Sequence, residues 1–314
     1  MSTFNLVRTI MTYTFPVISI IGLITNSITF AIFSRKKFKN TIFSTYFRAF
    51  LLFQCLNLIM PVNKMLEFNL NLYFSKISNL TCKLRYFYSF PNYAITAWFL
   101  VAISFDRYLS IAFPSKYQFR KSKLFQILTS LVIICYNYCF YIPCWFYYIK
   151  ETSKNESNET KINLKCISPG IWSNMMDLFQ SILMPFLIMI FFTSLTIKTI
   201  YRSRQIVINS TGLRSKDIKF AVSSITINSL FLIFNLPNFI ITLIYDYSDF
   251  FVNLNNLFIV LQSFCLFVFY INLSSTFFIN LAVNSLFRKE IETILFDRKK
   301  AKISKSTTVK TTSV

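Results

Sequence analysis

The sequence predicts an all-α membrane protein, a seven-transmembrane helix bundle with a short amphipathic cytoplasmic helix after the seventh span. Only 14% of the 314 residues are charged, whereas a soluble domain carries roughly a quarter. Seven predominantly apolar runs are long enough to cross a bilayer, which takes about 20 residues in a helix. Since we find no run that alternates apolar and polar residues as barrel strands do, helices are the remaining way to satisfy the backbone in lipid.

The seven apolar runs follow one another along most of the chain. We predict spans at 10–34, 43–66, 82–113, 124–149, 174–201, 218–245 and 254–283. One such run can be a buried helix of a soluble core, but seven leave no room for that core. The first run is long enough to span and lacks a small-residue cleavage site, so it predicts a helix and not a signal peptide. The expected domains are an extracellular N-terminus at 1–9, the membrane domain at 10–296 and a disordered cytoplasmic tail at 297–314.

Basic residues predict the orientation of the bundle. A net charge of +21 can indicate nucleic-acid binding, but here the charges form short clusters between apolar runs, so we expect no nucleic-acid partner. Loops that hold clustered Lys and Arg stay in the cytosol. The N-terminus is then extracellular and the C-terminus cytoplasmic, as in a multi-pass plasma-membrane protein. The clusters follow spans one, three, five and seven: Arg35, Lys36, Lys37, Lys39; Lys116, Arg120, Lys121, Lys123; Arg202, Arg204, Arg214, Lys216, Lys219; and Arg288, Lys289, Arg298, Lys299, Lys300, Lys302, Lys305, Lys310.

Glycosylation sequons agree with this orientation. Asn79, Asn155 and Asn158 each begin an Asn-x-Ser/Thr triplet in segments assigned to the outside. Two further triplets, at Asn209 and Asn272, fall in the cytosol and in the seventh span, and we interpret them as chance. The loop KETSKNESNETK, which holds Asn155 and Asn158, is polar and is expected to have no strong order of its own.

Cysteine placement predicts one disulfide. Five cysteines, Cys55, Cys135, Cys139, Cys144 and Cys265, fall within spans and are expected to be reduced packing residues. Cys82 opens the third span and Cys166 lies in the outer loop after the fourth, so both face an oxidising side where a disulfide persists. The alternative is that Cys144, near the outer end of the fourth span, takes one partner.

An acid and a base stand side by side at the inner end of the third span, as Asp106 and Arg107. A charge at the bilayer centre costs several kcal/mol, and intramembrane charges are usually functional. The predicted orientation places this pair at the cytoplasmic mouth, where the arginine reaches water or a partner protein. The chain contains no His, which removes the usual general base and the commonest metal ligand. We therefore expect no enzyme activity, no metal and no cofactor.

A set of ordered motifs resembles rhodopsin-like (class A) G-protein-coupled receptors from residue 15 to residue 296. Of these, the chain looks most similar to invertebrate neuropeptide receptors of the FMRFamide-receptor-like type. The intact DRY tripeptide is Asp106-Arg107-Tyr108, and Cys82 lies 25 residues before Arg107, as in the family. The other matching segments are GLITNSITFAIFSRKKFKN with Asn26, LMPFLIMIF with Pro185, FLIFNLPNFI with Phe231 and Pro237, and the amphipathic LFRKEIETIL.

The resemblance implies a mechanism. Asp106 holds Arg107 at rest, and on activation Arg107 turns toward the inner opening and meets the C-terminal helix of a heterotrimeric G protein. An always-charged guanidinium can donate to the backbone carbonyls at that helix end. Pro185 and Pro237 each remove a helix hydrogen bond, and Pro237 is the expected hinge.

Several positions depart from the family pattern. Gln54 stands where the family usually has Asp, which puts the sodium pocket of many relatives in doubt although Thr96 and Asn272 match its polar neighbours. The segment TFFIN, Thr276 to Asn280, replaces Asn-Pro-x-x-Tyr, and FNLP replaces the usual CWxP. The helix-4 Trp and the helix-5 Tyr are also missing. Such drift is compatible with a divergent sensory receptor or with weak coupling.

Two positions restrict the ligand class by the same resemblance. Ser89 stands where amine receptors need an Asp, and Tyr270 stands where opsins need a Lys. Outer aromatic residues with a few polar groups suit a short neuropeptide, and the candidate pocket comprises Ser89, Trp172, Tyr245 and Tyr270. A chemosensory receptor for small molecules is the alternative. A transporter or channel is less favoured because we find no inverted repeat.

The tail AKISKSTTVKTTSV is polar, basic and rich in Ser and Thr. Phosphorylation there would add negative charge that attracts an arrestin. Its last residues, Thr312-Ser313-Val314, fit a peptide that adds a strand to a PDZ domain. An unstructured solubilising tail is the simpler alternative.

Overall fold

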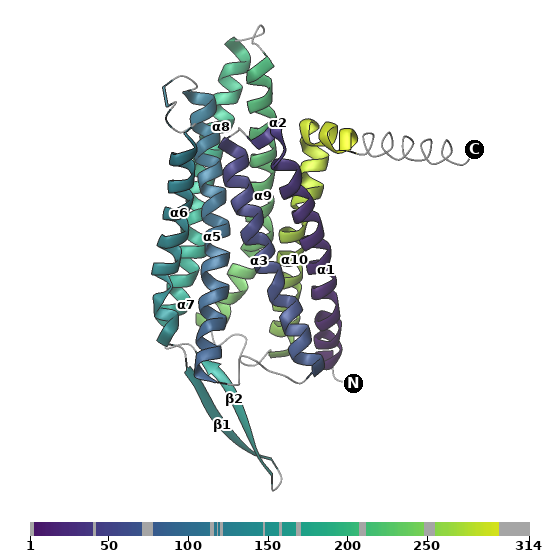
Figure 1. Ribbon diagram of the computed structural model, residues 1–314. Coiled ribbons are helices and arrows are strands. Elements are labelled where there is room, and N and C mark those ends of the chain that lie inside the picture. The colour runs from purple at the N-terminus through teal and green to yellow at the C-terminus, as the bar shows by residue number, and fades with distance from the viewer. Residues whose placement is uncertain are drawn as a thin grey trace, which may run out of the picture.

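A computed structural model describes residues 3–39, 42–70, 78–113, 116–117, 119, 122–146, 148–156, 159–167, 171–206, 212–247 and 255–294. Long helices lie side by side as one bundle, and a β-hairpin projects from one end (Figure 1). The long helices are α1 (Thr3–Phe33), α3 (Ile42–Leu70), α5 (Asn79–Ala112), α6 (Lys123–Phe140), α8 (Met184–Ile206), α9 (Gly212–Tyr247) and α10 (Asn255–Val283). The shorter elements are α2 (Lys36–Lys39), the 3₁₀-helix η2 (Ile142–Phe146), α7 (Ile171–Leu178), the π-helix η3 (Phe179–Leu183) and a helix at 285–294.

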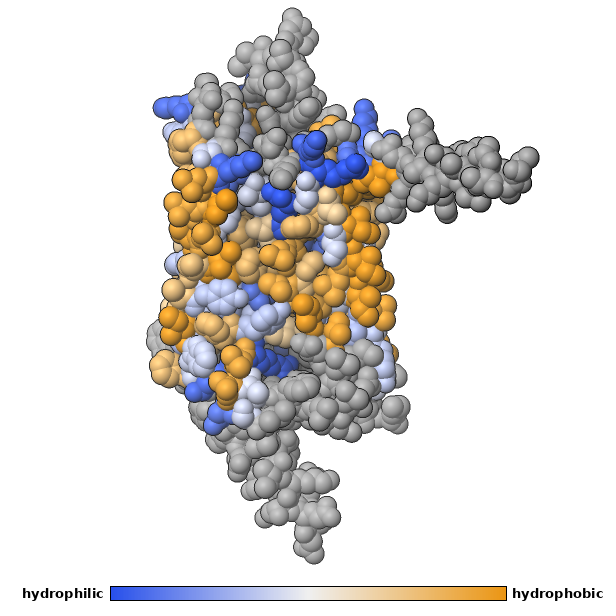
Figure 2. Space-filling model, viewed as in Figure 1, coloured by the Kyte–Doolittle hydropathy of each residue, from blue (hydrophilic) through white to orange (hydrophobic). Residues whose placement is uncertain are grey.

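The predicted helical membrane bundle is confirmed. Among the described residues, six helices are long and apolar enough to cross a membrane, and α9 adds the shorter apolar segment Val222–Pro237. Apolar residues dominate the middle of the bundle surface, and polar residues gather toward its ends (Figure 2). Helix α6 is the clearest case, because it exposes Leu128 and Val132 while it buries Gln126 and Asn137. A surface of this kind is stable in lipid and would aggregate in water.

The two ends of the bundle carry different features. The start of α1 and the hairpin of β1 (Tyr148–Glu156) and β2 (Glu159–Ile167) lie at one end, which we call the hairpin end (Figure 1). The C-terminal half of α5, α2 and the helix at 285–294 lie at the opposite end, which we call the Arg107 end (Figure 1). An ion pair of 3.1 Å between Arg35 and the buried Glu290 joins the segment after α1 to the helix at 285–294. The basic residues of 35–39 and the pair Arg288 and Lys289 therefore share the Arg107 end.

The predicted spans and the observed helices differ at some ends. The candidate membrane span Thr9–Phe33 agrees with the predicted first span, and the helix α1 itself begins earlier, at Thr3. The fourth span was predicted to run to residue 149, but α6 ends at Phe140 and the 3₁₀-helix η2 follows. Pro143 explains this end, because proline has no N–H to donate and its ring clashes with the preceding turn.

The loop between the fourth and fifth predicted spans, which was predicted to lack order, forms an antiparallel hairpin in register from Tyr148↔Ile167 to Glu156↔Glu159. The segment of β2 alternates apolar Ile162, Leu164 and Cys166 with polar residues, which is the period of a strand.

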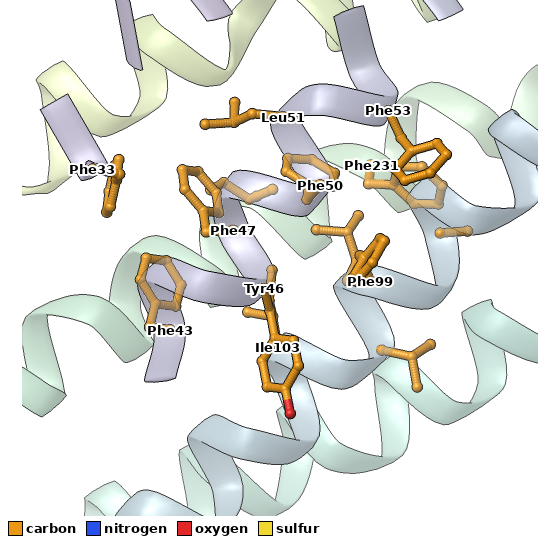
Figure 3. Packing of buried hydrophobic residues seen from close by; sticks show 14 of the residues in the cluster. Phe33, Phe43, Tyr46, Phe47, Phe50, Leu51, Phe53, Phe99, Ile103 and Phe231 are labelled. Atoms are coloured by element: carbon orange, nitrogen blue, oxygen red, sulfur yellow. The ribbon is translucent and has the colours of Figure 1, made fainter. Parts of the chain in front are cut away.

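Phenylalanine rings fill the core at the Arg107 end. Phe33, Phe43 and Phe47 are fully buried, and their rings face one another (Figure 3). Phe99 and Phe231 extend the same cluster toward α5 and α9. Buried aromatic rings contribute large contact areas with few rotatable bonds. This cluster therefore fixes α3 between α1 and α5, next to the acidic and basic pair that the sequence singles out.

Candidate functional site

Asp106 and Arg107 form a buried ion pair near the end of α5. Arg107 Nη2 lies 2.5 Å from Asp106 Oδ2, and each residue is only 4% exposed. The guanidinium carbon of Arg107 also lies 5.2 Å from the centre of the Phe43 ring. Two charges so far from water are stable only when they are paired, and removal of one leaves the other uncompensated.

The end of α5 brings this pair to the Arg107 end of the bundle. The helix ends at Ala112, where Phe113 N–H donates to the Leu109 carbonyl, and the sequence continues with Pro114. The residue before a proline avoids the helical region, which explains this end. Tyr108, the third residue of the motif, is half-buried, and its ring centre lies 6.1 Å from that of Phe113.

One helical turn before Arg107, three helices meet at a buried amide. Asn228 Nδ2 of α9 donates to Ser104 Oγ of α5 at 2.6 Å and to Thr193 Oγ1 of α8 at 3.3 Å. Ser104 and Asn228 are almost fully buried. The sequence reasoning did not identify this contact. The available signal was a polar residue, Asn228, within the apolar part of α9.

Phe231 and Pro237 lie farther along α9. Phe231 is 2% exposed and belongs to the aromatic core, whereas Pro237 lies inside the helix with an exposed side chain. Between them, Asn235 Oδ1 accepts a hydrogen bond of 2.8 Å from Tyr93 of α5. A cavity of about 50 Å³ separates this part of α9 from η3 and α8. Its lining residues are Ile182, Leu183, Phe186, Phe231, Leu232, Asn235 and Leu236.

Pro185, the second residue of α8, lies two residues after the π-helix η3 and accounts for its register. The Met184 N–H donates to the Phe179 carbonyl, five residues back. Pro185 has no N–H for the following carbonyl, that of Gln180, which instead accepts from Trp98 Nε1 of α5 at 3.2 Å. A single turn of π-helix is frequent at functional sites. Here it ties the start of α8 to α5.

The two departures from the family pattern in α3 and α10 bind each other. Thr276 Oγ1 donates to Gln54 Oε1 at 3.0 Å, and both side chains are buried. One turn later, Asn280 Oδ1 accepts from Ser223 Oγ of α9 at 3.0 Å. Direct hydrogen bonds thus link α3, α10 and α9 where many relatives have an acid and a water-bridged motif. Each bond of this kind contributes about 1 kcal/mol.

The other predicted signature residues also lie in the core. Asn26 Nδ2 donates to the Leu273 carbonyl of α10 at 3.0 Å, which ties α1 to α10. Asn272 is buried, and Thr96 accepts from Asn57 Nδ2 of α3 at 3.0 Å. Sequence reasoning missed Asn57, which lies one turn from Gln54 on the same face of α3.

Cys82 is disulfide-bonded, whereas Cys144 carries a free thiol. The alternative pairing through Cys144 was therefore wrong. Cys55, Cys135, Cys139 and Cys265 also carry free thiols. Cys166 lies on β2 with its side chain outside the described residues, so its pairing with Cys82 stays a prediction.

Two of the three predicted glycosylation sites can be placed, and both lie at or near the hairpin end. Asn79 is the first residue of α5 and is exposed. Asn155 lies on β1, but its side chain is outside the described residues, as is all of Asn158. Modification of these residues stays a prediction.

Two of the four predicted ligand-pocket residues can be placed. Ser89 Oγ donates to the Arg85 carbonyl of its own helix at 2.8 Å. Tyr270 is 7% exposed and packs against Phe15 of α1, with ring centres 5.1 Å apart. The side chains of Trp172 and Tyr245 lie outside the described residues. A pocket formed by these four residues stays a prediction.

The family of the chain follows from a comparison with protein-family models. A comparison with curated proteins finds no match. A family model described as 7 transmembrane receptor (rhodopsin family) matches residues 25–277, a range that includes Asp106, Arg107 and the Gln54–Thr276 contact. Members of this family are receptors and not enzymes, and they pass a ligand signal to G proteins. Because the match covers most of the sequence, the chain belongs to the rhodopsin family of seven-transmembrane receptors.

Proposed function

We propose that this receptor lies in the plasma membrane with its hairpin end outside, binds a short neuropeptide there, and couples to heterotrimeric G proteins at its Arg107 end. The distribution of charge supports this orientation. The lysines of α2 and the pair Arg288 and Lys289 lie at the Arg107 end, and clustered basic residues stay in the cytosol. Cys82 is disulfide-bonded near the hairpin end, and a disulfide persists on an oxidising side.

The observation that carries the coupling mechanism is the buried pair of Asp106 and Arg107. At rest, Asp106 neutralises Arg107 and keeps it inside the bundle. When the Arg107 end opens, the guanidinium turns away from Asp106 and donates to carbonyls at the end of a G-protein helix. Arg107 is charged in both states. Its charge is therefore compensated by Asp106 at rest and by the carbonyls of the G-protein helix in the active state.

A peptide with a basic residue fits the hairpin end. Asp177 of α7 is partly buried, and its Oδ1 accepts from Tyr141 of α6 at 2.6 Å. Within the described part of the chain, no Lys or Arg pairs with this carboxylate. An arriving ammonium or guanidinium group would gain a charge-assisted hydrogen bond there. We assign the candidate pocket to the space near Ser89, Trp172, Tyr245 and Tyr270.

Further parts of the proposal concern the outer and inner surfaces. A bond between Cys82 and Cys166 would anchor β2 to the start of α5, and glycans on Asn79, Asn155 and Asn158 would cover the same side. At the other end, the tail after residue 296, which lies outside the described residues, would bind an arrestin once phosphorylated, and a PDZ domain through Thr312-Ser313-Val314.

The proposal is tested by expressing the receptor with a promiscuous G-protein reporter and screening a peptide library beside a panel of small odorants. We expect a short peptide with a basic residue to activate the reporter. Activation by small volatile molecules alone would refute the neuropeptide proposal and favour a chemosensory receptor. Arg107→Ala should abolish agonist-driven nucleotide exchange and leave surface ligand binding intact, and wild-type signalling in that variant would refute the coupling mechanism.

Orientation has its own test. Epitope tags at the two chain ends should be stained on opposite sides of the plasma membrane, with the N-terminal tag accessible on intact cells. Accessibility of both tags on intact cells would overturn the proposed topology.

A further inference from the structure

We propose that Phe43 is a second resting-state partner of Arg107, and that the attraction between its ring face and the guanidinium helps to set the agonist-independent activity of the receptor. This inference rests on the proposed role of Arg107 in coupling. The guanidinium carbon lies over the Phe43 ring, 5.2 Å from its centre. A cation within about 6 Å of a ring centre is attracted by the negative face of the ring.

Burial makes this contact stronger than most contacts of its kind. Phe43 is 0% exposed and Arg107 is 4% exposed. Cation–π attraction is weak at exposed sites and grows severalfold when both groups are out of water. Asp106 supplies one side of the arginine with a full negative charge, while Phe43 offers the partial negative charge of its ring.

The ring of Phe43 is held in place independently of Arg107. It stacks on Phe47 with ring centres 5.0 Å apart and planes at 16°, and it packs against Phe33 at 5.8 Å (Figure 3). Next to it, Ser44 Oγ donates to the Phe33 carbonyl at 2.7 Å, which ties the start of α3 to the end of α1. Because its neighbours fix the Phe43 ring, the ring is already in position when Arg107 returns to the resting state. The contact then forms with little further loss of side-chain entropy.

The aromatic contact continues beyond Phe43 to the helix at 285–294. Phe33 stacks on Phe287 at 5.8 Å and 28°, and the Phe287 N–H donates to Asn284 Oδ1 at the start of that helix. The helix that lies across the Arg107 end therefore packs, through Phe33, against the same group of rings that contains Phe43. Phe43 therefore lies between the packed rings of Phe33 and Phe47 on one side and Arg107, the residue proposed to move, on the other.

Progressive fluorination of Phe43 distinguishes the electrostatic attraction of the ring face from the contribution of ring size to packing. Phenylalanine with one, two or three ring fluorines is incorporated at position 43 by nonsense suppression, because fluorine withdraws electron density with little change in shape. Phe43→Leu gives the case without a ring. The matched control is the same series at Phe47, which is equally buried one turn along α3.

Agonist-independent nucleotide exchange on a purified G protein is measured in membranes with equal amounts of receptor. We expect the rate to rise stepwise with each fluorine at position 43, and about tenfold with Phe43→Leu, since loss of a buried cation–π contact corresponds to about one order of magnitude in the equilibrium. The series at position 47 should be flat. Equal responses at the two positions would show a packing role only and would overturn the proposal.

A thermal double-mutant cycle tests the same contact without any signalling. Phe43→Leu should lower the melting temperature of the purified receptor by about 2–4 °C more in the native background than in the Arg107→Met background. Additive losses would overturn the contact. The cycle can also show coupling between Phe43 and Arg107 although neither the native receptor nor Arg107→Met supports nucleotide exchange. In that case the contact is confirmed and the proposed coupling to G proteins is refuted.

Discussion

The seam between α1 and α10 and the seam between α8 and α9 are built in opposite ways. In the first, side chains bond directly to backbone across the interface. Asn26 donates to the Leu273 carbonyl at 3.0 Å, and Ser274 Oγ donates to the Ile18 carbonyl at 3.1 Å. Gly22 permits this approach, because a Cβ there would lie 2.3 Å from Ser274 Oγ. Small residues let membrane helices approach until backbone and side chains touch.

The seam between α8 and α9 instead contains the cavity of about 50 Å³. Residues that line such a space lack dispersion contacts on one side, so the two helices hold each other less strongly there. A partly buried polar contact across this seam joins Asn228 to Thr193 at 3.3 Å, which is long for a hydrogen bond. We therefore expect α1, α3 and α10 to stay together and α9 to move relative to α8 when the Arg107 end opens.

The largest expected effect comes from filling the tight seam. Gly22→Val places methyl groups against Ser274 and Leu58, whose Cδ1 would already lie 2.8 Å from an added Cβ. Overpacking of a core costs about 1–3 kcal/mol and sometimes more. We expect a lower melting temperature of the purified receptor and a strong loss of surface expression. Ile28→Val at an exposed position of the same helix is the control, and equal behaviour of the two variants would show that this seam is not tight.

The next effect concerns the contact between Gln54 and Thr276, which ties α3 to α10. Gln54→Leu and Thr276→Val should each destabilise the receptor by about 1 kcal/mol, because each breaks the same buried hydrogen bond of 3.0 Å. In a thermal double-mutant cycle, the combined variant should lose no more than the worse single variant. Strict additivity would mean that the two side chains act separately.

This pair also illustrates what the sequence could not provide. Gln54 and Thr276 were each recognised as departures from the family pattern, but they lie 222 positions apart and nothing in one sequence indicates that they bond. The contact between Ser104 and Asn228, 124 positions apart, was missed for the same reason. By contrast, Asp106 and Arg107 were predicted, since adjacent charges at the end of an apolar run are visible without any tertiary information.

Local geometry was predicted only where a residue type dictates it. The seven apolar runs were visible because the bilayer requires a minimum length. Pro185 was identified, but the π-helix before it was not, since a shift to bonds five residues apart leaves no mark in the hydrophobic pattern. The hairpin was missed because β1 is polar after Ile149, and the alternation in β2 covers few residues.

A third prediction concerns the amide that joins α9 to its neighbours. Asn228→Leu removes the hydrogen bonds to Ser104 and Thr193, but it also removes Asn228 Oδ1, a buried acceptor for which the described residues provide no partner. We therefore expect a change in stability below about 1 kcal/mol. Agonist-independent nucleotide exchange should nevertheless rise about three- to tenfold, because α9 is released from α5.

Ser104→Ala is the matched variant for this prediction, since it breaks the same contact from α5. The two single variants and their combination should raise exchange to a similar level. A further rise in the combined variant, or no rise in either single variant, would show that this contact does not restrain α9.

The smallest expected effect comes from filling the loose seam. Leu183→Phe adds ring atoms beside the cavity of about 50 Å³, and filling such a space typically stabilises a protein by about 0.5–2 kcal/mol. If α9 uses this volume when the receptor is activated, the maximal agonist response should fall a few-fold while the melting temperature rises slightly. Leu187→Phe, one turn along α8 and 53% exposed, is the control. Leu236→Phe fills the same cavity from α9 and serves as a second variant against a steric clash at position 183. A full response in both filled variants, each with a raised melting temperature, would show that activation does not draw on this space.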